Sequence, residues 1–207
     1  MLIFVFHDFG ATGPGSIMCQ QVVDLAKKNN VIAFAPTYPT NNPHLAHIYL
    51  TDYITEKLTG ISMCFIGIGL GGYWARHLTR LHPGSHLILI NPMLQPWDTL
   101  QQYTGQNYNS VNGNSFELSP NDIIAHYIYR VEQDRNDLHA TIIIASDDNI
   151  VDSNKTIEIF TNREHIQLHS IIGGHRFLNT RNDVIDIICD AIFPKPEEDD
   201  NQPKDKN

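Results

Sequence analysis

The stretch CFIGIGLGGYW, residues 64–74, decides the fold, because an apolar run leads into a glycine-rich turn and then into a helix-forming segment. Two motifs fit this layout. Gly67, Gly69 and Gly72 match G-x-G-x-x-G, the fingerprint of a dinucleotide site. Residues 67–71 match G-x-S-x-G, the nucleophile elbow of serine hydrolases, except that Gly69 stands where the serine would be.

The dinucleotide interpretation is kept only as a remote alternative. The fingerprint normally opens the first strand–helix unit of a sheet, whereas these glycines follow the third apolar run of the chain. An acidic residue about 20 positions further on should hold the ribose, and the chain offers Asn91 in the run LILINP. The sequence therefore favours the elbow.

Short, nearly continuous apolar runs alternate with helix-forming segments along the chain. Such runs are typical of parallel strands that are buried on both faces. The expected strands are residues 2–7, 31–36, 64–68, 87–92, 141–146 and 166–171. The expected helices are residues 16–30, 43–58, 71–84, 121–134 and 182–193. The alternation predicts an α/β protein with a doubly wound, mainly parallel sheet and helices on both faces.

One domain is expected over residues 1–193, because a chain of 207 residues is long enough to bury a substantial core. Residues 93–120 are too long for a plain crossover and too polar for a core, so they are expected to form a small cap or lid. Within that lid, the residues predicted to line a cleft are Trp97, Tyr103 and Tyr108. Residues 194–207 are polar, acidic and without apolar periodicity, which predicts a disordered tail.

The composition argues against several classes of partner. A formal net charge of −9 disfavours nucleic acid and anionic membranes, which need basic patches. No stretch approaches the roughly 18 apolar residues of a membrane helix, and the opening MLIFVFHDFG lacks the basic region of a signal peptide. Three cysteines without a C-x-x-C motif are expected to be free thiols, which favours a cytoplasmic location.

Residues at the ends of the expected strands predict where the site lies. In an open parallel sheet, ligands bind at the carboxyl ends of the strands. The elbow motif requires the chain order nucleophile, acid, histidine, and Gly69, Asp148 and His175 follow that order at three strand ends. A strand-end aspartate usually caps a helix, and a lone histidine is usually structural. Together and in this order, they favour a hydrolase site.

The end of the first strand is expected to supply the oxyanion site. A backbone amide from an early strand end normally joins the amide that follows the nucleophile, which here belongs to Leu70. His7, Asp8 and Phe9 occupy the early strand end. These four residues, together with Trp97 of the cap, are the candidate oxyanion and substrate-binding residues.

These motifs resemble the YcfP/YqiA family of small bacterial α/β-hydrolase-like proteins, and the YcfP branch in particular. GIGLGGYWA matches the elbow of that branch, and NP, DNIVDS and HRF match its later motifs within residues 2–193. The resemblance implies an α/β-hydrolase fold and an esterase-like site, with a serine at the position of Gly69 in the YqiA branch and a glycine in the YcfP branch. Asp8 replaces the glycine of the family's usual His-Gly-Phe, which puts a side chain where the backbone should approach a substrate.

Glycine has no atom for nucleophilic attack, so the acyl-enzyme route of a serine esterase is closed at position 69. Cys64 and Ser62 cannot substitute, because they lie within or before the strand rather than at its tip. Glycine also relieves the strain of a positive φ at an elbow. If only the nucleophile is missing, Gly69→Ser is expected to restore ester cleavage that depends on His175.

Two interpretations of function therefore stay open beside the remote dinucleotide one. The first is a catalytically impaired pseudohydrolase, which is also compatible with binding of a small ester or acyl ligand. The second is a weak ester or thioester hydrolase in which His175 activates a water. No cofactor is expected, and no metal site either, because pairs such as His44 and His47, or His165 and His169, lack partners at ligand spacing.

Overall fold

The computed structural model describes residues 1–56 and 60–194. Apart from its first residue, the tail predicted to be disordered over residues 194–207 lies outside the described residues. In the described part of the chain, no helix is long and apolar enough to cross a membrane. All three cysteines are free thiols, two of them buried and Cys189 half-buried.

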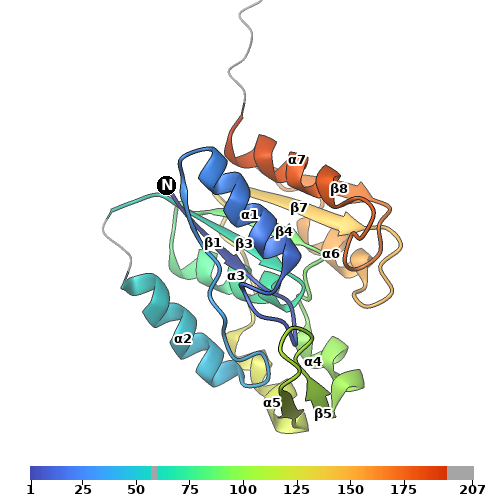
Figure 1. The fold of residues 1–207 in the computed structure, drawn as a ribbon. Coiled ribbons are helices and arrows are strands. Elements are labelled where there is room, and N and C mark those ends of the chain that lie inside the picture. Colours follow the sequence, from blue (N-terminus) through green and yellow to red (C-terminus); the bar gives the residue numbers. More distant parts are fainter. Residues whose placement is uncertain (57–59, 195–207) are drawn as a thin grey trace, which may run out of the picture.

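The described residues form a six-stranded parallel sheet in the order β2-β1-β3-β4-β7-β8 (Figure 1). Its strands are β1 (Leu2–Phe6), β2 (Ile32–Phe34), β3 (Met63–Ile68), β4 (His86–Ile90), β7 (Ala140–Ala145) and β8 (Ile166–Ile171). The six expected strands are therefore confirmed, each within a few residues of its predicted ends. Strands β1, β3, β4 and β7 are almost wholly buried, as continuous apolar runs predict.

Helices cover both faces of this sheet, which confirms the doubly wound arrangement (Figure 1). The larger helices are α1 (Ile17–Lys28), α2 (Pro43–Thr55), α3 (Leu70–Leu81), α6 (Ser153–Phe160) and α7 (Arg181–Ile192). Helices α1 and α7 bury Val22 and Ile188 against one face. Helices α2, α3 and α6 bury Leu50, Trp74 and Phe160 against the other.

Residues 93–120 form the segment expected to be a cap. It consists of α4 (Pro96–Thr99), the 3-10 helix η1 (Leu100–Tyr103) and an antiparallel hairpin of β5 (Gly105–Tyr108) and β6 (Ser115–Leu118). The turn of the hairpin contacts the loop after β1, because the amide of Ser110 donates to the Gly10 carbonyl at 2.7 Å. The side-chain amide of Asn109 donates to the Ala11 carbonyl at 3.1 Å. The hairpin is thereby anchored beside the carboxyl end of β1.

Two helix predictions need correction. The helix expected over residues 121–134 ends early, as α5 (Pro120–Ala125) followed by the 3-10 helix η2 (His126–Tyr129). The chain then turns away because Asp134 pairs with Arg76 of α3 and with Arg163. Helix α6 is not among the predicted helices, although Asp152 caps it by accepting from the amide of Asn154 at 3.0 Å.

Candidate active site

The elbow lies where strand β3 passes into helix α3. Gly69 precedes the helix with φ +52° and ψ −118°, as the elbow hypothesis predicts for this position. Two neighbouring glycines allow the strand and helix to approach closely. A Cβ on Gly67 would lie 2.3 Å from the Gly71 carbonyl oxygen, and one on Gly71 would lie 2.1 Å from the Phe6 carbonyl oxygen. The glycines are therefore explained by packing, without a bound nucleotide.

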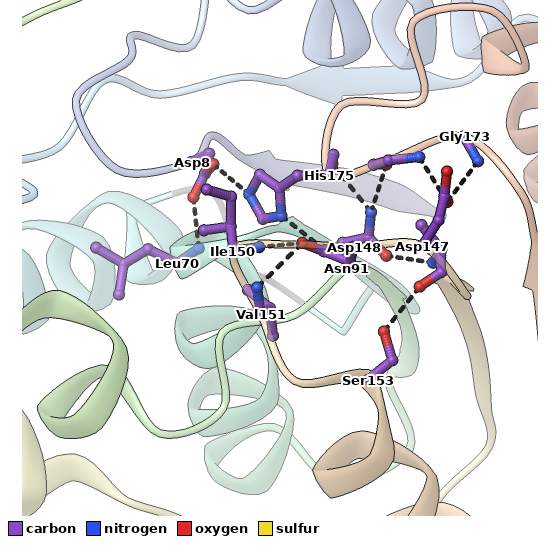
Figure 2. A network of polar contacts seen from close by, with 12 residues as sticks. Asp8, Leu70, Asn91, Asp147, Asp148, Ile150, Val151, Ser153, Gly173 and His175 are labelled. Atoms are coloured by element: carbon purple, nitrogen blue, oxygen red, sulfur yellow. Dashed lines mark hydrogen bonds and ion pairs between the residues drawn. The ribbon is translucent and has the colours of Figure 1, made fainter. Parts of the chain in front are cut away.

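The carboxylate of Asp8 lies directly over the elbow (Figure 2). Its Oδ1 accepts hydrogen bonds from the amides of Phe9 at 2.7 Å and Leu70 at 2.8 Å. Its Oδ2 lies 3.0 Å from Nε2 of His175. Two amides from separate strand ends that converge on one oxygen make the geometry of an oxyanion hole. Here the oxygen belongs to a side chain of the protein itself.

Asp148 and His175 are brought together from the ends of β7 and β8 (Figure 2). Nδ1 of His175 lies 2.8 Å from Oδ2 of Asp148. The other oxygen of Asp148 accepts from the amides of Ile150 at 2.7 Å and Val151 at 3.0 Å. Both oxygens of the Asp148 carboxylate therefore take part in hydrogen bonds, and the Asp148 side chain is only 1% exposed. The pair has the arrangement by which an acid orients a histidine.

The imidazole of His175 lies between two carboxylates, and this sets its charge. Burial alone would lower the pKa of His175, but the hydrogen bonds and charges of Asp148 and Asp8 outweigh burial and raise it to about 9. Burial would raise the pKa of Asp148, yet the hydrogen bonds from His175 and from two amides hold it below its usual value. At neutral pH, His175 is therefore an imidazolium that donates from both ring nitrogens.

Gly69 and Asp8 depend on each other sterically. A Cβ built on Gly69 would lie 1.9 Å from Oδ1 and 2.2 Å from Cγ of Asp8. Any side chain at position 69 must therefore displace the carboxylate from its hydrogen bonds. Gly69→Ser alone therefore also requires the Asp8 side chain to move, so the site differs from a serine site at two positions.

Two further residues, which the sequence did not single out as site residues, hold the His175 loop. Asn91 directly follows β4 with φ +41°, and its side-chain nitrogen donates to the carbonyl of His175 at 2.9 Å. The side-chain oxygen of Asn91 accepts from the amide of Ala145 at 2.6 Å. Asp147 accepts from the amides of Gly173 and Gly174, both at 2.8 Å. In the sequence, the Asn91-Pro92 pair at a strand end could have indicated the role of Asn91, because asparagine tolerates a positive φ.

Two candidate substrate-binding residues lie elsewhere. His7 is fully buried: its ring stacks on Tyr38 with centroids 4.4 Å apart, and its Nε2 accepts from the amide of Tyr38 at 3.3 Å. Successive side chains of an extended chain point to opposite sides, so His7 faces the core when Asp8 faces the site. Trp97 packs edge-on against Tyr127 at 5.0 Å and lines a different cavity, beside Arg76.

A cavity of about 460 Å³ opens beside the carboxylate of Asp8. Residues of the cap that line it include Tyr103 and Tyr108, as expected, together with Met93. Phe9 packs on Tyr103 with ring centroids 5.4 Å apart, so the wall next to Asp8 is aromatic. His175 and Asp8 supply polar groups at the same cavity, which has the mixed lining of a small-molecule site. Within residues 1–56 and 60–194, no cluster of side chains has the arrangement of a metal site.

The fold is shared with solved α/β-hydrolases. Alpha/beta hydrolase domain-containing protein 10 from mouse superposes with a TM-score of 0.73 at 13% identity, over 92% of this chain and 89% of that one. Est1E from Butyrivibrio proteoclasticus, solved with ferulic acid bound, superposes with a TM-score of 0.72 at 14% identity, over 92% of this chain and 87% of that one. At such identities, the likeness shows an α/β-hydrolase fold.

Curated relatives match about half of the chain. A UPF0227 protein of Shewanella loihica is 31% identical over 102 residues, which are 48% of this chain and 54% of the relative. A UPF0227 protein of Shewanella woodyi is 33% identical over 101 residues, 48% of this chain and 55% of that one. The chain therefore spans about half the length of these relatives. Residues 1–189 match the uncharacterised protein family UPF0227, and the chain belongs to that family.

Proposed function

We propose that this protein is a pseudohydrolase with respect to serine chemistry: it does not cleave esters through an acyl-enzyme at position 69, and its cavity binds a small neutral ester or acyl compound. One observation carries the proposal. Oδ1 of Asp8 accepts from both amides of the oxyanion hole, while Oδ2 accepts from His175. A carboxylate of the protein thus takes the donors that a serine ester intermediate would need.

The weak-hydrolase alternative, in which His175 activates a water, is disfavoured by charge. A general base must be unprotonated at the working pH. The pKa of His175 is raised to about 9, so the imidazole is protonated at neutral pH, and Nε2 of His175 already donates to Asp8. The dinucleotide alternative is disfavoured because the carboxylate of Asp8 already accepts from the amide of Leu70 at the start of α3, where a pyrophosphate would bind.

The test is hydrolysis of p-nitrophenyl acetate by a set of matched variants. The wild type is expected to show no hydrolysis that depends on His175, and Gly69→Ser alone is expected to stay inactive because Asp8 blocks the hole. Asp8→Gly combined with Gly69→Ser removes the block and supplies the nucleophile. Recovery of the two oxyanion donors should raise the rate of this double variant on the order of 10²-fold above either single variant.

A triple variant that also carries His175→Ala is the control, and it should lose the gained activity. Wild-type turnover of p-nitrophenyl acetate that disappears in His175→Ala would overturn the proposed function. A folded double variant without activity would show that more than these two positions separates the site from an esterase.

A further inference from the structure

A second cavity lies apart from the one beside Asp8, and we infer that it binds a flat aromatic carboxylate whose charge is held by Arg76 and Arg163. The cavity measures about 840 Å³, and its walls come from α3, α4, α6 and the loops that follow η2 and α6. The inference goes beyond the proposed function and does not rest on it, because neither arginine lines the cavity beside Asp8.

The charges around this second cavity do not cancel. The carboxylate of Asp134 accepts from Nε and Nη2 of Arg76, at 2.8 and 2.9 Å, and from Nη1 of Arg163 at 2.7 Å. One negative charge thus faces two guanidinium groups, which stay protonated, so one positive charge is left over. The other charged pair of the lining, Arg130 with Glu132, is balanced. A ligand with a single negative charge therefore matches the cavity.

Both guanidinium groups also keep N–H groups for a ligand. Each carries five, and Asp134 takes only two of those on Arg76. The Arg76 side chain is 9% exposed, and none of its nitrogens is both buried and unpartnered, so the free N–H groups are reached from the cavity that it lines. Arg163 gives one N–H to Asp134 and another to the carbonyl of Arg135 at 3.1 Å. The planar forks that remain match the two oxygens of a carboxylate.

An aromatic wall selects what carries the carboxylate. Trp97 of α4 and Tyr127 of η2 line the cavity, with ring centroids 5.0 Å apart and planes at 75°. The guanidinium of Arg130 covers one face of Tyr127, with its Cζ 3.8 Å from the ring centroid. Leu94 and Ile159 add aliphatic surface. A small inorganic anion would leave this wall and most of the volume unused, whereas an aromatic acid contacts the wall and the arginines together.

The test compares two probes of the same shape, 2-naphthoate and its neutral amide, 2-naphthamide. Each is titrated into isotope-labelled wild-type protein and followed by NMR. The chain has two tryptophans, of which Trp74 is fully buried and Trp97 lines the cavity, so their indole N–H signals localise binding. Naphthoate is expected to shift the Trp97 signal and not that of Trp74. Naphthamide should bind about tenfold more weakly, because it lacks the charge that strengthens hydrogen bonds to a guanidinium.

Variants locate the charge that the probe recognises. Arg163→Gln removes the excess positive charge, while Asp134 keeps both hydrogen bonds from Arg76. The affinity for naphthoate should fall about tenfold, and that for naphthamide should stay the same. Arg163→Lys keeps the charge and should retain the preference for naphthoate. Arg176→Gln is the matched control, because Arg176 is an exposed arginine that lines the cavity beside Asp8, and it should change neither affinity.

Equal affinity of the wild type for the two probes, or a Trp97 signal that naphthoate does not shift, would overturn the inference. So would a loss of naphthoate binding in Arg176→Gln that is equal to or larger than the loss in Arg163→Gln. The comparison of the two probes needs no variant, so it decides the matter even where Arg163→Gln does not fold. Hydrolysis of p-nitrophenyl acetate bears only on the proposed function.

Discussion

Two carboxylates of this protein, Asp8 and Asp134, are hydrogen-bonded on both oxygens, yet their surroundings differ. Asp134 lies between the guanidinium groups of Arg76 and Arg163, at 2.7 to 2.9 Å, and its side chain is only 5% exposed. Asp8 lies between two backbone amides and His175, and its side chain is 25% exposed. The first carboxylate connects three segments of chain, and the second faces a cavity.

The difference shows how partners determine what a buried carboxylate can do. Burial opposes the charge of Asp134, but Arg76 and then Arg163 outweigh it and lower its pKa, and a guanidinium cannot release its proton. The partner of Asp8 is an imidazole, which can lose a proton near pH 9. The larger cavity, about 840 Å³, is lined by the ion pair of Arg76 and Asp134, whereas the smaller one is lined by Asp8 and the imidazole of His175.

The largest expected effect comes from removing the structural carboxylate. Asp134→Asn leaves the Arg76 side chain, which is 9% exposed, without its charged partner. Breaking one side of a buried pair costs about 3–5 kcal/mol, so the free energy of unfolding measured with urea should fall by that amount. Asp137→Asn, which removes an exposed partner of Arg135, is the matched control and should leave the midpoint unchanged. Equal effects of the two variants would contradict the role given to Asp134.

The pH dependence of stability distinguishes Asp8, which is paired with an imidazole, from Asp134, which is paired with guanidinium groups. Because the folded pKa of His175 is raised from 6.5 to about 9, its stabilisation is fully present below pH 6.5 and is lost as the pH rises through 9. The shift corresponds to about 3 kcal/mol. Asp8→Asn should reduce this loss, and an NMR titration should show a lower pKa of His175. The same pKa in wild type and variant would show that Asp8 does not hold the proton.

A substitution of Asn91 tests how much its uncharged hydrogen bonds stabilise the loops around the site. Asn91→Ala removes the partners of the Ala145 amide and the His175 carbonyl. Unsatisfied buried groups cost about 1–3 kcal/mol, so the unfolding free energy should fall within that range. Faster amide hydrogen exchange should be confined to the His175 loop and the end of β7. Exchange that increases around Asp134 instead would contradict this local effect.

The smallest effect is expected at the surface pair of Asp98 and Lys155. Their charged atoms lie 3.3 Å apart, but both side chains are about half exposed, at 51% and 46%. Exposed pairs contribute about 0–1 kcal/mol, so Asp98→Asn should change the unfolding free energy by less than about 1 kcal/mol. A larger loss of unfolding free energy would mean that solvent exposure does not explain why this ion pair stabilises the protein less than the ion pair of Asp134.

Local patterns accounted for much of the fold. Continuous apolar runs marked all six strands, because strands buried on both faces leave a contiguous hydrophobic stretch. Glycine at position 69 indicated a positive φ before the helix, and it has φ +52°. Local signals failed where distant partners decide, as at residues 121–134, where the pairing of Asp134 replaces a helix by irregular chain.

The sequence by itself determined the α/β class and the chain order of Gly69, Asp148 and His175, because strand ends can be located from one stretch at a time. Only the tertiary structure decided what Asp8 does. Its carboxylate accepts from the amide of Leu70, 62 residues away, and from His175, 167 residues away. No linear pattern encodes such contacts, since they exist only when parallel strands bring their carboxyl ends to one edge of the sheet.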